Sequence, residues 1–313
     1  MTKPFSTYQY LGGKPMNERD KLEAGSKYWN KGKWNNLVAP FLPKDCSELT
    51  LVDMGCNAGL FLKLAEGRGF DKVVGVDSDK EAVRRGLAWR DKQGGNYQIL
   101  LAEMESCIDK LPVADYTIFV NSHYYFKLAD WLEYLNKLKD KACYCIIVTA
   151  KKRPNPNYAP SDIAKLRSNF KAWQEVGIID LPPNDTPHSR QLWSLCFKNP
   201  HLNRVPIDSL DNGNAQQRDF LAELDKTQDP LKTRYYKRLK DYRARKGSGQ
   251  RVWSEKRLVG YMHERVALYE DIKKNGLKEA LVVNSKNVRI KDGNHRHEIM
   301  KHLGYKSIIV KKI

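Results

Sequence analysis

The 313-residue sequence contains little cysteine and no long hydrophobic run. Its six cysteines include no C-x-x-C pair and lie in or beside apolar segments, so we expect reduced core thiols and neither zinc ligands nor a disulfide framework. The mean hydropathy of -0.65 predicts no membrane span. Residues 1–10 lack the apolar stretch of a secretory signal, and we therefore expect a cytoplasmic protein without a membrane partner.

Acidic residues are scarce relative to basic ones: 37 Asp and Glu stand against 55 Lys and Arg, for a net charge of +18. Residues 201–313 hold 26 of these basic and 14 of these acidic residues, so the C-terminal third carries +12 of the excess. The densest block, 231–257, would attract polyanions such as nucleic acid. Its alternative interpretation is a solvated helix that buries one face, because Leu231, Tyr235 and Leu239 recur at helical spacing. Charge alone does not decide between these interpretations.

The most informative motif follows the apolar run 49–52 and reads Asp53-Met54-Gly55-Cys56-Asn57-Ala58-Gly59. The pattern predicts a buried strand, a glycine-rich turn and a helix over 60–66, and the next strand, 72–76, is followed directly by Asp77. Glycine lets a ligand approach the backbone, and a carboxylate after the second strand is placed to accept bonds from ribose hydroxyls. The pyrophosphate fingerprint G-x-G-x-x-G is missing, which argues against a dinucleotide.

The motif resembles the first motif of class I S-adenosylmethionine (AdoMet) methyltransferases, usually D-x-G-x-G-x-G, with Asn57 in place of the middle glycine. The resemblance implies an α/β domain with a doubly wound, Rossmann-like sheet and AdoMet as its cofactor. It also implies that Asp77 binds the ribose and that Glu103, after a third strand over 97–101, binds the adenine. The methionine end would be held by Asp53, Gly55, Asn57 and Gly59.

A polar and aromatic cluster, Asn121-Ser122-His123-Tyr124-Tyr125, follows the fourth predicted strand, 116–120. Ligands of open parallel sheets gather at the carboxyl ends of the strands, so we expect this cluster to face the transferred methyl group, with Asn121 counted among the cofactor contacts. His123 is the candidate general base, and Tyr124 or Tyr125 is expected to orient the acceptor. The alternatives are that His123 only packs and that methyl transfer needs only alignment.

We place the first domain at residues 1–200. Its remaining segments are expected to supply a helical lid and the other strands of the sheet. We expect a helical lid over 17–42 and a fifth strand over 143–149. Extended runs around 177–179 and 192–197 are expected to close the sheet as an antiparallel pair. A further resemblance is to transferases that modify the wobble uridine of transfer RNA and to their relatives, which include enzymes acting on small molecules. It is carried by Trp29 and Trp34 with Lys31 and Lys33, by Asp53-Met54-Gly55-Cys56 and by the cluster 121–125.

The second domain, placed at residues 201–313, resembles the ParB/sulfiredoxin fold in the order of its elements, with a basic helical insertion at about 211–260. The resemblance implies a nucleotide- or phosphate-binding module that uses a nucleoside triphosphate with Mg. Sulfiredoxin has its reactive cysteine where this chain has Asn294, which excludes reductase chemistry.

The signature of this module is Gly293-Asn294-His295-Arg296, which is expected to open a helix. A glycine-led helix N-terminus beside an arginine is chemically a phosphate site, because backbone N–H groups, the helix dipole and a bidentate cation converge there. His295 and His297 are two residues apart and would diverge on a helix, so no metal site is predicted.

Taken together, the residues predict an AdoMet-dependent methyltransferase that acts on an anionic acceptor: RNA, a nucleotide or a phosphorylated small molecule. Two other classes stay open. One is an NTP-dependent kinase or NTPase of the ParB/sulfiredoxin fold with an AdoMet-sensing first domain. The other is a non-enzymatic nucleic-acid-binding protein, for which steeply salt-dependent binding without cofactor use is expected.

Overall fold

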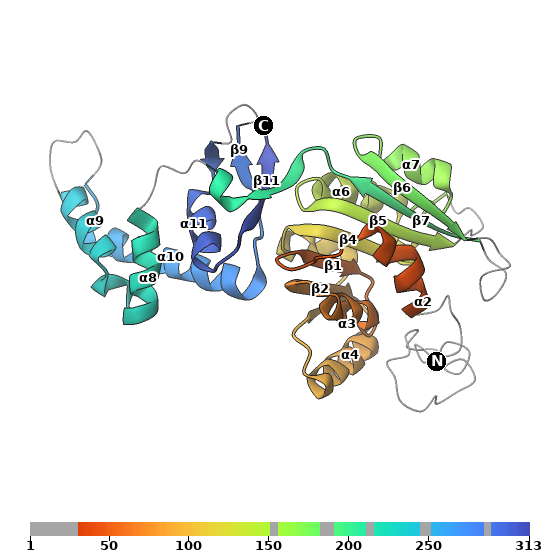
Figure 1. Ribbon diagram of the computed structural model, residues 1–313, viewed down its shortest axis with the longest axis horizontal. Helices are drawn as coiled ribbons and strands as arrows, with labels where there is room; N and C mark the ends of the chain where they lie inside the picture. Colours follow the sequence, from red (N-terminus) through yellow and green to blue (C-terminus); the bar gives the residue numbers. More distant parts are fainter. Residues whose placement is uncertain (1–30, 151–155, 182–190, 211–215, 245–251, 285–288) are drawn as a thin grey trace. The chain divides into compact units, whose positions relative to one another are not determined.

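The computed structural model describes residues 31–150, 156–181, 191–210, 216–244, 252–284 and 289–313. The chain divides into two compact units, residues 1–203 and 204–313, and each is described by itself (Figure 1).

The first unit is built on a mixed seven-stranded sheet in the order β3-β2-β1-β4-β5-β7-β6. The first five strands pair in parallel, and β7 pairs antiparallel with both β5 and β6. This arrangement confirms the predicted doubly wound α/β sheet and its closing antiparallel pair. The strands are β1 (Thr50–Met54), β2 (Lys72–Asp77), β3 (Gln98–Leu101), β4 (Ala114–Val120), β5 (Ala142–Ala150), β6 (Gln174–Leu181) and β7 (Leu192–Lys198).

Helices cover both faces of this sheet, because alternate residues of the central strands point to opposite sides. In β1, Val52 and Met54 belong to one buried cluster and Leu51 to the other. The Leu51 face packs against α3 (Leu60–Gly67) and α4 (Lys80–Gln93). The Val52 face packs against α5 (Met104–Cys107), the short helix η3 (Ile108–Lys110), α6 (Leu128–Leu138) and α7 (Ile163–Asn169).

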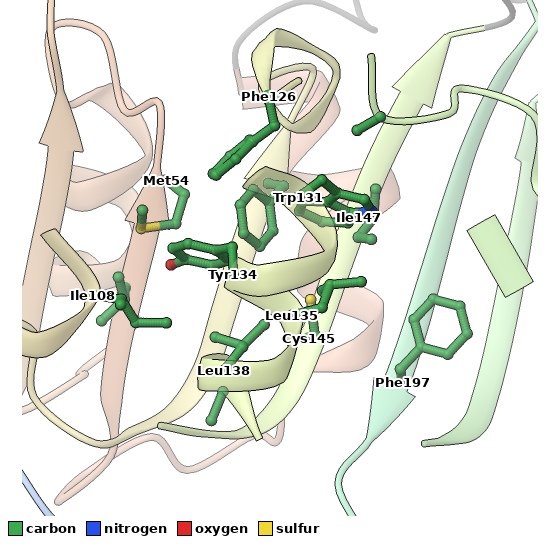
Figure 2. Close-up of a cluster of buried hydrophobic side chains, with 14 of the residues drawn as sticks. Met54, Ile108, Phe126, Trp131, Tyr134, Leu135, Leu138, Cys145, Ile147 and Phe197 are labelled. Atoms are coloured by element: carbon green, nitrogen blue, oxygen red, sulfur yellow. The ribbon is translucent and has the colours of Figure 1, made fainter. Parts of the chain in front are cut away.

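Helix α6 packs two large aromatic side chains, Trp131 and Tyr134, into the buried cluster on the Val52 face (Figure 2). Its buried side chains recur at i, i+3, i+4 and i+7, namely Trp131, Tyr134, Leu135 and Leu138. The Trp131 ring lies 5.4 Å edge-on from Phe119 of β4. Burying each large apolar side chain is worth roughly 1.5–3 kcal/mol, so α6 holds β4, and the loop that follows β4, firmly in place.

The described part of the predicted lid comprises α2 (Lys31–Lys33), η1 (Trp34–Val38) and η2 (Ala39–Phe41). Trp34, Leu37 and Val38 are buried in the cluster on the Leu51 face, and the Ser194 hydroxyl donates to the Leu37 carbonyl at 2.5 Å. The apolar side chains of this part pack on the sheet, where η1 covers β5 and β7, and a lid over the ligand site stays a prediction. Residues 17–30 of the predicted lid lie outside the described residues.

The second unit contains a four-stranded sheet in the order β10-β9-β11-β8, with β9 antiparallel to β10 and parallel to β11. Two described α-helices, α8 and α9, lie within the predicted insertion at about 211–260. Helix α10 begins inside this insertion at Glu255 and ends outside it at Asn275. The resemblance to the ParB/sulfiredoxin fold stays a prediction. The elements are β8 (Leu202–Pro206), η6 (Ile207–Ser209), α8 (Gln216–Thr227), η7 (Pro230–Lys232), α9 (Arg234–Ala244), α10 (Glu255–Asn275), β9 (Leu281–Val283), β10 (Ile290–Asp292), α11 (Asn294–His302) and β11 (Ser307–Lys312).

All six cysteines are buried free thiols, as predicted for core residues. Across the described ranges, none of the helices combines the length and the apolar character that crossing a membrane requires.

Candidate functional site

The turn between β1 and α3 is held against β2 by two backbone hydrogen bonds. The N–H groups of Gly55 and Cys56 both donate to the carbonyl of Val76, at 2.8 and 2.9 Å. Gly55 has φ +79°, and a Cβ there would lie 2.4 Å from the Cβ of Ser122, in the loop after β4. Only glycine satisfies both the conformation and the close approach. The turn therefore joins the carboxyl ends of three neighbouring strands.

Asp53 lies in β1 just before this turn and is almost completely buried, with 1% of its surface exposed. Within the described residues, neither of its carboxylate oxygens has a hydrogen-bond partner. Burial, with a smaller contribution from the charge of Asp77, raises the pKa of Asp53 well above its usual value. An unpaired buried carboxylate is costly, so the site is built for a positively charged group or a strong donor.

Two asparagines add further acceptors at the same edge of the sheet. The side-chain oxygens of Asn57 and Asn121 are buried and lack a hydrogen-bond partner among the residues that the structure describes. Both residues adopt the left-handed conformation, with φ of +52° and +57°. Asn121 is anchored at the end of β4 by its N–H, which donates to the carbonyl of Val148 at 2.9 Å. Together with Asp53, they form a set of acceptors suited to a donor-rich ligand.

Asp77 ends β2 and organises the turn. Its carboxylate accepts hydrogen bonds from the backbone N–H groups of Asn57 at 2.7 Å and Asp79 at 2.9 Å. Burial is the largest influence on its pKa and raises it, although these two bonds act in the opposite direction. Each carboxylate oxygen retains a second lone pair for a ligand hydroxyl.

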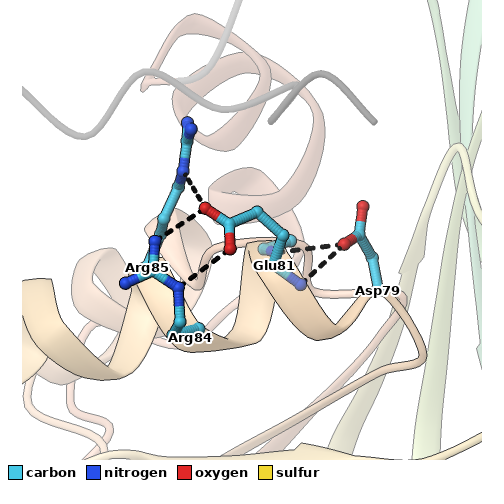
Figure 3. Close-up of polar contacts among 5 residues, drawn as sticks. Asp79, Glu81, Arg84 and Arg85 are labelled. Atoms are coloured by element: carbon cyan, nitrogen blue, oxygen red, sulfur yellow. Dashed lines mark hydrogen bonds and ion pairs between the residues drawn. The ribbon is translucent and has the colours of Figure 1, made fainter. Parts of the chain in front are cut away.

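The start of α4 lies directly after Asp77, and the N–H of its N-cap residue, Asp79, donates to the Asp77 carboxylate. Asp79 caps this helix by accepting from the N–H groups of Glu81 at 2.9 Å and Ala82 at 3.1 Å (Figure 3). Glu81 in turn pairs with Arg84 and Arg85, and these hydrogen bonds lower the pKa of Glu81 to about 2. The first turn of α4 is thus a rigid support for the end of β2.

Glu103 is exposed and precedes α5, immediately after β3. It makes no side-chain capping bond to its own helix. Its charge contributes to raising the pKa of Asp77, so the two carboxylates lie near each other. The loops after β2 and β3 therefore bring Asp77 and Glu103 to the same part of the site.

His123 is buried and is held by a distant segment of the chain. The ring is fully buried, and its Nε2 lies 3.1 Å from the carbonyl oxygen of Pro160. Because a carbonyl only accepts, Nε2 must carry the hydrogen in this contact. The ring centroid also lies 5.9 Å from that of Trp131. His123 thus joins the short helix η4 (His123–Tyr125) to the segment at Pro160, and its role as a general base stays a prediction.

The tyrosines of η4 are more accessible. Tyr124 is partly buried, whereas Tyr125 is 62% exposed, and their ring centroids lie 5.0 Å apart. Tyr158, which is 40% exposed, lies on the segment that forms an antiparallel bridge with Lys127. Tyr124 and Tyr125 therefore follow Asn121 closely, just after the carboxyl end of β4.

Sequence reasoning placed Ser122 in the cluster after β4 but did not find its role in the turn. Its hydroxyl donates to the carbonyl of Met54, and its side chain occupies the space where a Cβ of residue 55 would lie. A serine beside a predicted ligand loop is only a weak signal for such a role.

In the second unit, Gly293 caps α11 with φ +101°, as expected for a glycine-led helix. Arg296, however, donates to Asp292 at 2.7 Å and Glu279 at 2.5 Å, and its side chain is only 12% exposed. Two exposed carboxylates therefore pair with the guanidinium, and the phosphate site stays a prediction.

The other residues of that motif are placed differently from Arg296. Asn294 is the first residue of α11, and His295 lines a small cleft together with residues of α8, α9 and α10. Among the described residues, no group of three or more His, Cys, Asp or Glu side chains is arranged to hold a metal ion.

A family model described as a methyltransferase domain matches residues 27–220, which is more than half of the chain. The chain belongs to this methyltransferase family. The match covers every strand of the first unit and the Asp53–Gly59 turn, and it extends into the start of the second unit. The methyltransferase sequence matches no curated protein.

Solved structures similar to this methyltransferase include three with a TM-score of 0.47. Magnesium protoporphyrin IX methyltransferase from Synechocystis PCC 6803 with bound SAM is 15% identical over 60% of this chain and 87% of its own. Geranyl diphosphate C-methyltransferase from Streptomyces coelicolor A3(2) is 15% identical over 60% of this chain and 86% of its own. A protein from Pyrococcus horikoshii OT3 is 13% identical over 62% of this chain and 96% of its own.

Proposed function

We propose that the protein is an AdoMet-dependent methyltransferase whose cofactor binds the loops after β1, β2, β3 and β4. The observation that carries this proposal is the buried Asp53 carboxylate, which has no partner among the described residues. An α-ammonium group supplies the charge and the N–H donors that this carboxylate needs. The phosphate-binding turn of a dinucleotide enzyme would have no use for a carboxylate at that position.

The other residues of the site fit the remaining parts of AdoMet. Gly55 and Gly59, both with positive φ, leave the backbone of the turn open to the ligand, and the Asn57 oxygen adds an acceptor beside Asp53. Asp77 binds the ribose hydroxyls and Glu103 the adenine. When bound, AdoMet supplies a methyl group activated by a sulfonium. The protein's part is to bind, orient and exclude water.

For the transfer itself we propose alignment without a histidine base. Asn121 and the Tyr124–Tyr125 pair lie at the end of β4, where they can position an acceptor, while His123 is committed to Pro160. Holding two reactants in a productive geometry supplies much of the rate enhancement, so a dedicated base is not required for an acceptor that is already nucleophilic.

We propose an anionic acceptor, such as RNA, a nucleotide or a phosphorylated small molecule, that the second unit recruits. The support is helix α9, which carries four exposed basic residues, Arg234, Lys237, Arg238 and Lys240, and one exposed acidic residue, Asp241. Glu223 pairs with Arg234 and Glu255 with Lys240, whereas Lys237 and Arg238 are exposed and form no ion pair among the described residues. Such a surface steers polyanions. The kinase and NTPase alternative has no such support, because Arg296 is held by carboxylates.

The cofactor proposal is tested by isothermal titration of AdoMet into the full-length protein. Asp77→Ala removes the acceptor of the Asn57 N–H and the predicted ribose contact, so binding heat should disappear. Asp91→Ala is the matched control: Asp91 lies on α4, its carboxylate is 66% exposed, and within the described ranges its ion pair is with the neighbouring Arg90. Unchanged AdoMet affinity in a folded Asp77→Ala variant contradicts the proposed site.

The acceptor is found by a separate experiment. RNA, nucleotides and phosphorylated sugars are incubated with protein and tritiated AdoMet, and transferred label is measured. Label in an anionic class, lost when Lys237 and Arg238 are both changed to Gln, is the expected result. Transfer to an uncharged acceptor that is insensitive to this double substitution refutes the anionic acceptor and leaves the cofactor site standing.

A further inference from the structure

One surface of the second unit interleaves aromatic rings with arginine side chains. The Arg243 guanidinium of α9 lies 5.5 Å from the ring centre of Tyr242 and 4.4 Å from that of Trp253. The Arg257 guanidinium of α10 lies 4.7 Å from the centre of the same Trp253 ring. These four side chains, which we call the arginine-aromatic series, therefore connect the end of α9 to the start of α10.

The series is partly fixed in the protein and partly open to solvent. Trp253 packs against the buried cluster of this unit, and its ring lies 5.3 Å edge-on from that of Tyr261. Tyr242 is 47% exposed, and Arg257 is exposed as well. The series thus offers an aromatic ring and a guanidinium to solvent on a well-packed base.

Positive charge is concentrated on the series itself. Because Arg243 and Arg257 lie 4.4 and 4.7 Å from the centre of one ring, their guanidinium groups are within about 9 Å of each other. Two like charges at such a separation still repel at physiological ionic strength, where the screening length is about 8 Å. Arg238, which is exposed, lies one helical turn before Tyr242 on α9. A bound polyanion would relieve this repulsion.

The carboxylates in and around these segments do not reverse this charge balance. The described parts of 231–257 hold eight basic residues and two acidic ones, Asp241 and Glu255. Two more carboxylates, those of Asp229 and Glu223, reach the same segments through ion pairs. Basic residues still outnumber these acidic residues two to one, so the surface attracts polyanions.

Among polyanions, an unpaired nucleic-acid strand fits the series best. Its bases stack on aromatic rings and on arginine planes, while its phosphates meet basic side chains. A duplex hides the faces of its bases. An anionic membrane requires an apolar helix face to insert, and α9 does not offer one because Tyr235, Tyr236 and Leu239 pack into the buried cluster.

We propose that the arginine-aromatic series binds a single-stranded segment of RNA, with a base stacked on Tyr242 and phosphates on Lys237, Arg238 and Arg257. The proposal rests on the anionic acceptor proposed above and selects RNA, the polymer, within that class. Binding of RNA requires neither AdoMet nor methyl transfer, so this surface and the cofactor site are tested separately.

The probe is a fluorescently labelled oligouridylate of about 12 nucleotides, a length typical of one single-strand-binding surface. It is titrated with the full-length protein without AdoMet, and anisotropy is measured. An abasic ribose-phosphate chain of the same length keeps every phosphate and removes every base. Oligouridylate should bind at least fivefold more tightly than this chain, because one stacked base changes affinity by roughly 5- to 150-fold.

Tyr242→Ala should weaken oligouridylate binding at least fivefold. It removes a ring and no charge, so the slope of log affinity against log salt should stay unchanged. Tyr242→Phe keeps the ring and should stay within twofold of the wild type. If Tyr242→Ala does not fold, Tyr242→Leu takes its place, since leucine keeps apolar bulk without a flat ring.

Arg257→Gln removes one phosphate contact and should make the salt slope shallower by about 0.7. Lys274→Gln is the matched control, because Lys274 is also exposed on α10 but lies in its last turn. The two positions are about 25 Å apart along the helix axis. The control should keep its affinity within twofold and its salt slope unchanged.

Several results would overturn the proposal. They are no oligouridylate binding, equal affinity for the abasic chain, duplex RNA bound as tightly as the single strand, and unchanged affinity in folded Tyr242→Ala. A DNA strand of the same length bound tenfold more tightly would refute the choice of RNA. Binding to phosphatidylserine vesicles that is lost in Tyr242→Ala would assign the surface to a membrane. RNA that binds as expected but receives no methyl label refutes the RNA acceptor and leaves this surface standing.

Discussion

The carboxyl groups of Asp53 and Asp77 lie toward the ends of neighbouring parallel strands, and the charge of Asp77 adds to burial in raising the pKa of Asp53. The two differ in their partners. Asp77 is bonded to two backbone N–H groups, whereas Asp53 has no partner among the described residues. The free protein thus holds a buried carboxyl group that is stabilised only when a positive ligand arrives, which links stability, protonation and binding at one residue.

Asp53→Asn is expected to stabilise the free protein near neutral pH. The folded-state pKa of Asp53 is raised above its unfolded value of about 3.9, so the wild type loses stability as the pH rises from about 4 through the raised pKa. Asparagine does not titrate. We expect a gain on the order of 1 kcal/mol at pH 7.5, or about 2–4 °C in Tm, that shrinks as the pH falls toward 4. Thermal unfolding without ligand at several pH values measures it. A lower Tm for the variant at pH 7.5 would contradict this account.

AdoMet affinity is expected to rise as the pH rises from about 4 toward the raised pKa of Asp53. Over this range the amino group of the ligand stays protonated, while binding requires Asp53 in its ionised form. Binding should therefore release protons, most at low pH, and the release should vanish in Asp53→Asn along with most of the affinity. Titration calorimetry in two buffers of different ionisation enthalpy counts the protons. Proton uptake, or a release that persists in Asp53→Asn, would disprove the role given to this carboxyl group.

Gly55→Ala is expected to abolish AdoMet binding and to lower the free energy of unfolding by more than the cost of positive φ alone. The new Cβ would lie 2.4 Å from the Cβ of Ser122, so the turn or the loop after β4 must move. Gly69→Ala is the control: it also has positive φ, +95°, but meets no atom within 4 Å. It should lose only about 1 kcal/mol and keep AdoMet affinity. Chemical denaturation and calorimetry compare the two, and equal effects would show that the close approach to Ser122 is unimportant.

His123→Gln is expected to keep the rate of methyl transfer within threefold of the wild type, with an unchanged pH profile. The amide N–H of glutamine can replace the hydrogen bond to the Pro160 carbonyl. His123→Phe leaves that buried carbonyl without its donor and should lower the free energy of unfolding by roughly 1–3 kcal/mol. Rates are measured with the acceptor found by the labelling screen. A fall of 100-fold or more in folded His123→Gln, with loss of one limb of the pH profile, would restore the general base.

The sequence by itself determined the first unit's sheet and the ligand-binding turn. Strands β1 and β2 are apolar runs, Gly55 and Gly59 permit positive φ, and Asp77 follows its strand directly, so each feature depends on residues close together along the chain. The same local rules placed Gly293 at the start of a helix.

Only the tertiary structure decided the environment of individual side chains. His123 belongs to a polar stretch of the sequence, but its ring is buried and bonded to the carbonyl of Pro160, 37 residues away. Arg296 pairs with Glu279, 17 residues away. Arg265 and His295 line the same small cleft although 30 residues separate them in the sequence. Backbone conformation follows from neighbours in the chain, whereas burial and charge balance follow from whichever distant segments pack together, and no local pattern contains that information.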